Sequence, residues 1–191
     1  MNYLAHAFLS NHDNDLLIGN FIADHIRGND FKDFNAGIIE GIHLHRSIDT
    51  FTDAHPDFKK SKRVFYNGFE KYSGILIDIY FDYFLAKDFL KYSEISLENF
   101  SKNVYKVYAD NEYLLPKSSS RFLEYVIKNN VYRSYSNIKG IETVLNHLSH
   151  RIQHRVQLDD SIRLFKENEA ELQANFDSFF RDVLAHFSKK D

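Results

Sequence analysis

Cysteine is absent from the 191-residue chain, and proline and glycine are scarce, with two and seven residues respectively. Without cysteine there can be no disulfide framework and no thiolate metal ligand, so any metal must be bound by nitrogen and oxygen. The absence also fits a reducing compartment, and we expect a cytoplasmic protein. With so few prolines and glycines, long stretches of the chain contain no residue that breaks a helix.

The chain also lacks long apolar stretches and a strong excess of one charge. No apolar run approaches the length needed to cross a bilayer, and the first residues, M-N-Y-L-A-H, lack the basic start of a signal peptide. The 24 basic and 27 acidic residues give a net charge of -3 at pH 7, which argues against a general nucleic-acid binder. We therefore expect neither a membrane nor a nucleic acid as partner.

The pattern that is present is helical. Apolar residues recur at spacings of three and four along nearly the whole chain, and no segment alternates as a strand does. Asp13 and Ser96 are expected N-caps, and Pro56 is expected to end the helix before it. The expected helices are Asn2–Ser10, Asp13–Arg27, Asn35–Asp53, Asp57–Asn67, Gly74–Phe89, Ser96–Tyr113, Arg121–Asn129, Ser136–Gln153 and Asp159–Phe187. The sequence thus predicts an all-α multi-helix bundle, a single domain over residues 1–191, as a monomer or small homo-oligomer.

The densest group of polar side chains lies in the segment G-I-H-L-H-R-S-I-D-T-F-T-D, from Gly41 to Asp53. In a helix His45, Asp49 and Asp53 follow one another at intervals of four residues and share one face. Imidazole and carboxylate groups can hold a divalent cation, and the neighbouring Arg46 suits a phosphate oxygen. The solvated side of an ordinary amphipathic helix would show the same pattern, and this alternative stays open.

Two further carboxylates lie one turn apart in the strongly apolar segment Gly74–Phe89. Asp78 and Asp82 share a face with apolar residues, so we expect both to point inward. Two like charges on a buried face are unfavourable unless a cation, an arginine or a shared proton compensates them. This pair is therefore the strongest sign of a metal site that the residues give by themselves, although a hydrogen bond at a helix junction would also explain a buried aspartate.

Other polar residues interrupt apolar helices. Asp24 and Arg27 share the narrow polar strip of their helix, where they form either a structural ion pair or, for Asp24, a metal ligand. His6 is a single histidine on a short apolar helix, a position more typical of a hydrogen-bonded core residue. His43 lies two residues before His45 and points in another direction, so we expect the two to do different jobs.

Basic residues gather in two places. One is a basic cluster directly after the histidine-rich helix, formed by Lys59, Lys60, Lys62 and Arg63. In the other, His147, Arg151 and His154 recur at i, i+4 and i+7, a pattern that surface charge explains, although Arg151 also suits a phosphate. The basic cluster has the same ordinary explanation in solvated charge at a helix end.

Common catalytic templates such as G-x-x-x-x-G-K, G-x-S-x-G and H-E-x-x-H are missing, but longer motifs resemble a known family. M-N-Y-L-A-H at the N-terminus, G-N-F-I-A-D-H-I-R-G-N at residues 19–29 and the Gly41–Asp53 segment resemble the acyl carrier protein phosphodiesterases. The similarity continues through residues 74–85 and V-L-N-H-L-S-H-R at residues 144–151. It therefore spans most of the chain.

The resemblance implies an all-helical enzyme, distantly similar to HD-type metal-dependent phosphohydrolases. It would hydrolyse holo acyl carrier protein to apo acyl carrier protein and 4'-phosphopantetheine, with manganese as cofactor and iron or magnesium as alternatives. Because acyl carrier protein is strongly acidic, the basic cluster would be its docking site. A related phosphohydrolase acting on nucleotides or other small phosphoesters, and a non-catalytic helical interaction protein, remain alternatives.

The same resemblance implies roles for individual residues. The expected metal ligands are Asp24, His45, Asp49 and Asp82, with His6, Asp78 and His43 as further ligands or as their supporting partners. The expected catalytic residues are His43, Arg27, Arg46 and Arg151. The arginines would stabilise charge on the phosphoryl oxygens, and either a protonated His43 or a metal-bound water would protonate the leaving serine.

Overall fold

The computed structural model describes residues 2–10, 13–28, 30–31, 33–153 and 156–187. Within these ranges every regular element is helical, which confirms the all-α prediction. The α-helices are α1 Tyr3–Leu9, α2 Asn14–Ile22, α3 Ala36–Ala54, α4 Pro56–Val64, α5 Tyr66–Phe69, α6 Ser73–Lys87, α7 Leu97–Asp110, α8 Lys117–Lys128, α9 Val131–Ser134, α10 Ile138–Arg151, α11 Ser161–Glu167 and α12 Glu169–Phe187. Short 3₁₀ helices are η1 Ala23–His25, η2 Glu70–Tyr72, η3 Phe89–Lys91, η4 Glu112–Leu114 and η5 Leu158–Asp160.

Local sequence signals set several helix ends as expected. The Asp13 side chain accepts hydrogen bonds from the backbone N–H groups of residues 15 and 16 at the start of α2. Ser96 caps α7 by accepting from the N–H of Asn99. α3 stops at His55, whose extended backbone (ψ 133°) is the conformation that a following proline favours.

Several expected helices are divided in the structure, among them the second and the last. The helix predicted to reach Arg27 ends as an α-helix at Ile22 and continues only as the 3₁₀ turn η1. The final helix is divided at Asn168, whose side-chain amide donates to the carbonyl of Leu164 and so competes with the helical backbone hydrogen bonds. Both breaks change the course of the chain without adding a strand.

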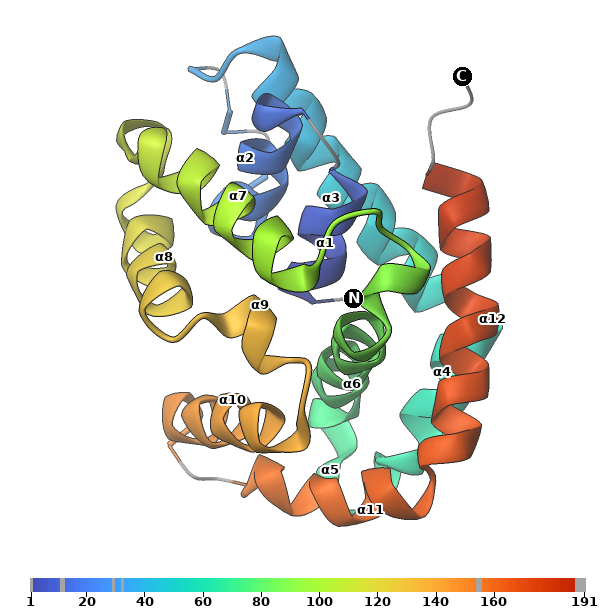
Figure 1. Cartoon of the computed structure of the whole chain (residues 1–191). Coiled ribbons are helices and arrows are strands. Elements are labelled where there is room, and N and C mark those ends of the chain that lie inside the picture. The colour runs from blue at the N-terminus through green and yellow to red at the C-terminus, as the bar shows by residue number, and fades with distance from the viewer. Residues whose placement is uncertain (1, 11–12, 29, 32, 154–155, 188–191) are drawn as a thin grey trace.

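α6 is the central helix of the fold. It is apolar around most of its circumference, and eleven of its fifteen residues are buried, as expected for a helix covered on all sides. Figure 1 shows α4 and α12 on one side of α6, α9 and α10 on the other, and α1 to α3 at its upper end. α6 contacts α1, α4, α10 and α12, so it is the surface on which the N-terminal and C-terminal helices are arranged.

α2 and α3 approach each other closely because both carry glycine at the crossing. A Cβ atom added to Gly19 would lie 2.0 Å from the carbonyl oxygen of Ile38, and one added to Gly41 would lie 2.4 Å from that of Leu16. Only glycine allows this backbone contact. The crossing brings the polar residues of α2 against the histidine-bearing face of α3.

Among the described helices, none combines the length with the hydropathy that a membrane span requires.

Candidate metal centre and pocket

Two imidazoles and a carboxylate converge where α1 meets α3. His6 on α1 and His45 on α3 are buried, with ring centroids 4.2 Å apart. Nε2 of His6 lies 3.2 Å from Oδ1 of Asp49, and Nε2 of His45 lies 3.2 Å from Oδ2 of the same carboxylate. One ligand atom from each residue lies within 4.8 Å of the others. Nitrogen and carboxylate ligands at this spacing can hold a divalent cation.

Asp24 completes this cluster from the 3₁₀ turn η1. Its Oδ1 lies 3.2 Å from Nε2 of His45. The side chains of Asp24 and Asp49 are 55% and 47% exposed, whereas those of His6 and His45 are 7% and 9% exposed. The cluster is thus closed on the imidazole side and open on the carboxylate side.

The charges of the cluster follow from these contacts. Burial disfavours the charged form of His6 and lowers its pKa. Burial opposes the charged form of His45 too, but the hydrogen bonds from its ring to Asp24 and Asp49 outweigh burial and raise its pKa to about 9. The hydrogen bond with His45 lowers the pKa of Asp24. For Asp49, burial alone would raise the pKa, but the adjacent rings of His45 and His6 hold it well below its usual range. At neutral pH the four side chains therefore hold one more negative than positive charge, which favours a cation.

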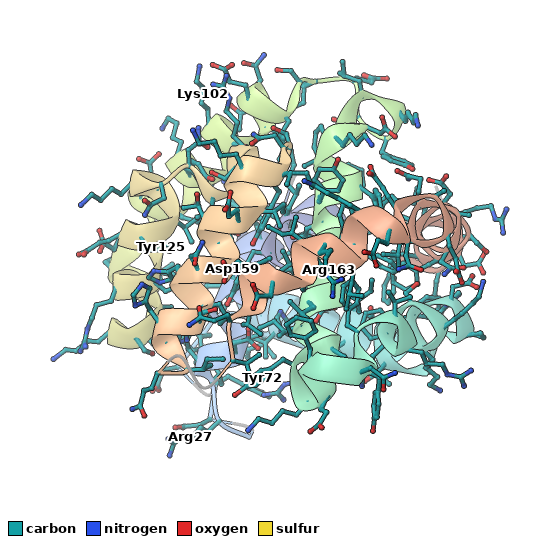
Figure 2. The ribbon with its side chains drawn as sticks, turned by 90° about the horizontal axis from the view of Figure 1, so that it is seen from below. Arg27, Tyr72, Lys102, Tyr125, Asp159 and Arg163 are labelled. Atoms are coloured by element: carbon teal, nitrogen blue, oxygen red, sulfur yellow. The ribbon has the colours of Figure 1, made fainter. Side chains whose placement is uncertain are left out.

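The cluster lines a pocket of about 350 Å³. The other walls come from α6, α8, α9 and α10 and include the apolar side chains of Ile75, Phe122 and Leu148. The rings of Tyr125 and His147 stack at 4.0 Å, and both residues line the pocket. Figure 2 shows Tyr125 beside α10 in the view from below. The pocket therefore joins a charged end to an aromatic and aliphatic wall.

Asp82 and Asp78, expected as ligands, lie apart from the converging atoms. Asp82 is fully buried, as expected, but its Oδ2 and Oδ1 accept the backbone N–H groups of Leu4 and Ala5 at 2.8 Å and 3.2 Å. It therefore caps the first turn of α1, the helix that carries His6. Burial raises the pKa of Asp82 to about 7, although the hydrogen bond from Leu4 favours the ionised form. Asp78 is half-buried and lines the pocket.

Of the four expected catalytic residues, one lies at the pocket. This is Arg151, at the end of α10, which lines the pocket. Arg46 donates to the carbonyl of Gly28 and lies 5.7 Å from the ring of Phe31, and the exposed ring of His43 packs edge-on against that same ring at 5.3 Å. Arg27 is exposed and lies at the lower edge of the molecule in Figure 2. His154 lies outside the described residues.

The pattern of residues gave no role to two members of the site. Asn20 is buried between the two imidazoles, with its Oδ1 2.9 Å from Nδ1 of each ring. In the sequence Asn20 is a lone polar residue on an apolar helix, four residues before Asp24. Its role could not be predicted from that pattern, because its hydrogen-bond partners His6 and His45 lie on two other helices. His147 was explained as surface charge, whereas its ring lies in the pocket wall.

Comparison with known proteins agrees with the family that the sequence motifs resemble. The family model for acyl carrier protein phosphodiesterase matches residues 1–183. The acyl carrier protein phosphodiesterase of Photorhabdus laumondii is 27% identical over 192 residues, which cover 100% of this chain and 97% of the relative. That of Escherichia coli O157:H7 is 30% identical over 195 residues, covering 100% of this chain and 99% of the relative. No solved structure matches, so no structural neighbour supports the expected likeness to HD-type phosphohydrolases. The chain belongs to the acyl carrier protein phosphodiesterase family.

Proposed function

We propose that this protein is a metal-dependent phosphodiesterase that hydrolyses holo acyl carrier protein to apo acyl carrier protein and 4'-phosphopantetheine. Family membership over residues 1–183 supports the substrate. The observation that carries the chemistry is the convergence of His6, His45 and Asp49 within 4.8 Å of one another at the wall of a pocket. A phosphodiester bound in this pocket would meet both a cation and a cationic side chain.

The donor set fits a divalent cation. His6, His45, Asp49 and Asp24 would hold it with two imidazole nitrogens and carboxylate oxygens, a mixed set that suits Mn²⁺ or Fe²⁺, with Mg²⁺ as an alternative. A bound cation of this kind polarises a phosphoryl oxygen and lowers the pKa of water. Asp82 supports the site from α1 instead of as a ligand, because its two oxygens accept backbone N–H groups.

Arg151 is the arginine that we assign to the phosphate. It lines the pocket together with Asp24 and Asp49, and a guanidinium group there can neutralise charge that develops on the phosphoryl oxygens. Arg46 donates a hydrogen bond to the carbonyl of Gly28 and packs on the ring of Phe31, and Arg27 lies at the edge of the molecule. Contact with the phosphate is therefore not part of our proposal for these two.

The shape of the pocket supports a substrate longer than a simple phosphate. 4'-Phosphopantetheine joins a phosphate to a chain of methyl, methylene and amide groups. With its phosphate at the charged end, this chain would lie along the apolar wall that includes Phe122, Tyr125 and Leu148.

The basic cluster on α4 is the proposed docking surface for the acidic carrier protein. A Cβ atom on Gly74 would lie 3.9 Å from Cε of Lys62, so Lys62 lies close to the start of α6, where Ile75 begins the pocket wall. Lys59 and Arg63 are exposed. Lys60 contributes less because it pairs with Glu171 at 3.0 Å.

Mass spectrometry of holo acyl carrier protein incubated with the full chain and Mn²⁺ tests the proposal. We expect the carrier protein to lose its prosthetic group, and His45→Ala to abolish this loss. If the chain hydrolysed nucleotides or a small phosphodiester but left holo carrier protein intact, the result would instead favour a small-molecule phosphohydrolase. A chain that binds no metal and turns over neither substrate would favour a helical interaction protein.

A further inference from the structure

Asn20 makes four hydrogen bonds around a single buried amide. Its Oδ1 lies 2.9 Å from Nδ1 of His6 and 2.9 Å from Nδ1 of His45. Its Nδ2 donates to the backbone carbonyl of His6 at 3.2 Å and to Oγ of Ser10 at 2.8 Å. The residue is 2% exposed, so every polar atom of the side chain depends on these protein partners.

These partners fix which way the amide points. The carbonyl oxygen of His6 can only accept a hydrogen bond. The hydroxyl of Ser10 donates its proton to that same carbonyl at 2.8 Å, so its oxygen is left to accept. The NH₂ group of Asn20 must therefore face His6 O and Ser10 Oγ, and the amide oxygen must face the two rings.

The orientation of the amide determines the protonation of both rings. An amide oxygen accepts but cannot donate, so each Nδ1 must carry a proton. With that proton on Nδ1, the nitrogen that can present a lone pair to a cation is Nε2. Both Nε2 atoms point at the carboxylate of Asp49. We propose that Asn20 is a positioning residue that holds His6 and His45 together in the Nδ1–H tautomer, so that both Nε2 atoms can bind one divalent cation.

The inference rests on the proposed metal-dependent function and adds a shared orienting group to it. Metal-binding histidines usually donate their second ring N–H to a separate partner that orients the ring. Here one oxygen orients two rings whose centroids are 4.2 Å apart. Replacing it therefore frees both ligands at once, and losing such partners typically weakens metal affinity by about 10- to 100-fold.

Titration with Mn²⁺, with the free ion followed by electron paramagnetic resonance, tests this in the full chain. We expect Asn20→Ala to weaken Mn²⁺ binding by about 10- to 100-fold. Asn175→Ala is the matched control, since Asn175 is also buried, at 6% exposure, and bonds Ser61 and Lys60 away from the cluster. The control should lower the melting temperature while leaving Mn²⁺ affinity unchanged. Unchanged affinity in folded Asn20→Ala would overturn the proposal.

Nitrogen NMR of the histidine rings in the metal-free wild-type chain needs no variant and covers the case in which Asn20→Ala does not fold. We expect Nδ1 of both His6 and His45 to carry a proton, and an unprotonated Nδ1 in either ring overturns the proposal. If Asn20→Ala loses affinity while the wild type does not hydrolyse holo carrier protein, the proposed function fails and the role of Asn20 stands. A wild-type chain that binds no Mn²⁺ overturns both.

Discussion

Asp49 is the residue on which the cluster converges. Each of its two carboxylate oxygens lies 3.2 Å from a different imidazole nitrogen, and those contacts hold its pKa well below the usual range. The carboxylate is therefore ionised throughout the neutral pH range, and it is partly exposed to the pocket. Both properties suit a metal ligand.

Asp49→Asn should weaken Mn²⁺ binding by at least about tenfold, because the amide keeps the shape of the side chain but loses its charge. Turnover of holo carrier protein should fall by a larger factor than the affinity does. Titration with Mn²⁺ and mass spectrometry measure the two effects. Asp53→Asn is the matched control one turn further along α3, since Asp53 lines the same pocket outside the converging group. Equal loss of affinity in both variants would contradict the assignment of Asp49.

Asp82 should make stability depend on pH. Burial raises its folded-state pKa to about 7 from the ordinary value of 3.8. The folded chain therefore binds this proton more tightly than the unfolded chain, and the stability that Asp82 contributes is present at low pH and is lost as the pH rises through about 4 to 7. Relative to Asp82→Asn, the free energy of unfolding of the wild type should fall across this window. Urea unfolding at several pH values measures it, and parallel profiles for the two chains would count against a buried titrating carboxyl.

The crossing of α2 and α3 is the element contact on which the site depends most directly. α2 carries Asn20 and α3 carries His45, and their hydrogen bond spans this crossing. A Cβ atom on Gly41 would lie 2.4 Å from a backbone oxygen, which cannot move as a flexible side chain can.

Gly41→Ala should therefore destabilise the fold by about 1–3 kcal/mol and also weaken Mn²⁺ binding, because α2 must move away from α3. Thermal unfolding and Mn²⁺ titration measure the two effects. Gly74→Ala in α6 is the control, since the nearest atom to its added Cβ would be 3.9 Å away and alanine favours the helix. Comparable destabilisation by both changes would mean that the crossing is not tight.

The cations of α4 should affect binding of the carrier protein and not the hydrolysis step. Reversing Lys62 and Arg63 to glutamate should raise KM for holo carrier protein, most strongly at low salt, and leave turnover of a small phosphodiester unchanged. Lys102→Glu on α7 is a charge-reversal control, because α7 lies on the other side of the molecule from α4 in Figure 1. An equal loss of activity toward both substrates would contradict the docking role of α4.

The parts of this fold that were predictable are those set by neighbouring residues. Asp13 and Ser96 cap the helices that they precede, and the helix before Pro56 stops where the proline requires. The end of α2 at Ile22 was not predictable, since no glycine or proline lies between Ile22 and Gly28 and the turn into η1 depends on packing against α3. Burial of Asp82 followed from the apolar pattern of α6, but its partner, the start of α1, lies 78 residues away in sequence.

The candidate site was predictable only as a set of residue types. Spacing placed His45 and Asp49 on one face of α3, and resemblance added His6 and Asp24. The hydrogen bonds of Asn20 join α1, α2 and α3, and no local pattern gives such a meeting of three helices. Arg46 was expected to act on the phosphate from its place beside His45, and His43 was given a catalytic role with the resemblance, whereas the turn of the helix directs both toward Phe31.

The molecule as a whole should be stabilised by the metal. The proposed ligands come from α1, η1 and α3, so the unfolded chain has no assembled site and the cation binds only the folded form. Mn²⁺ at 100 times its dissociation constant should then stabilise the fold by about 2.7 kcal/mol, and the melting temperature should rise with concentration. Thermal unfolding with Mn²⁺ or with a chelator measures this. An equal rise in the Asp49→Asn chain would place the ion elsewhere.

The unequal exposure of the cluster determines how a cation bound there would be exchanged. The imidazoles are almost fully covered, whereas about half the surface of each carboxylate is open, so an ion can enter and leave along the pocket without any helix moving. Exchange is then decoupled from unfolding. The identity of the bound ion would then depend on which ions surround the folded protein, and not on which ion was present when the chain folded.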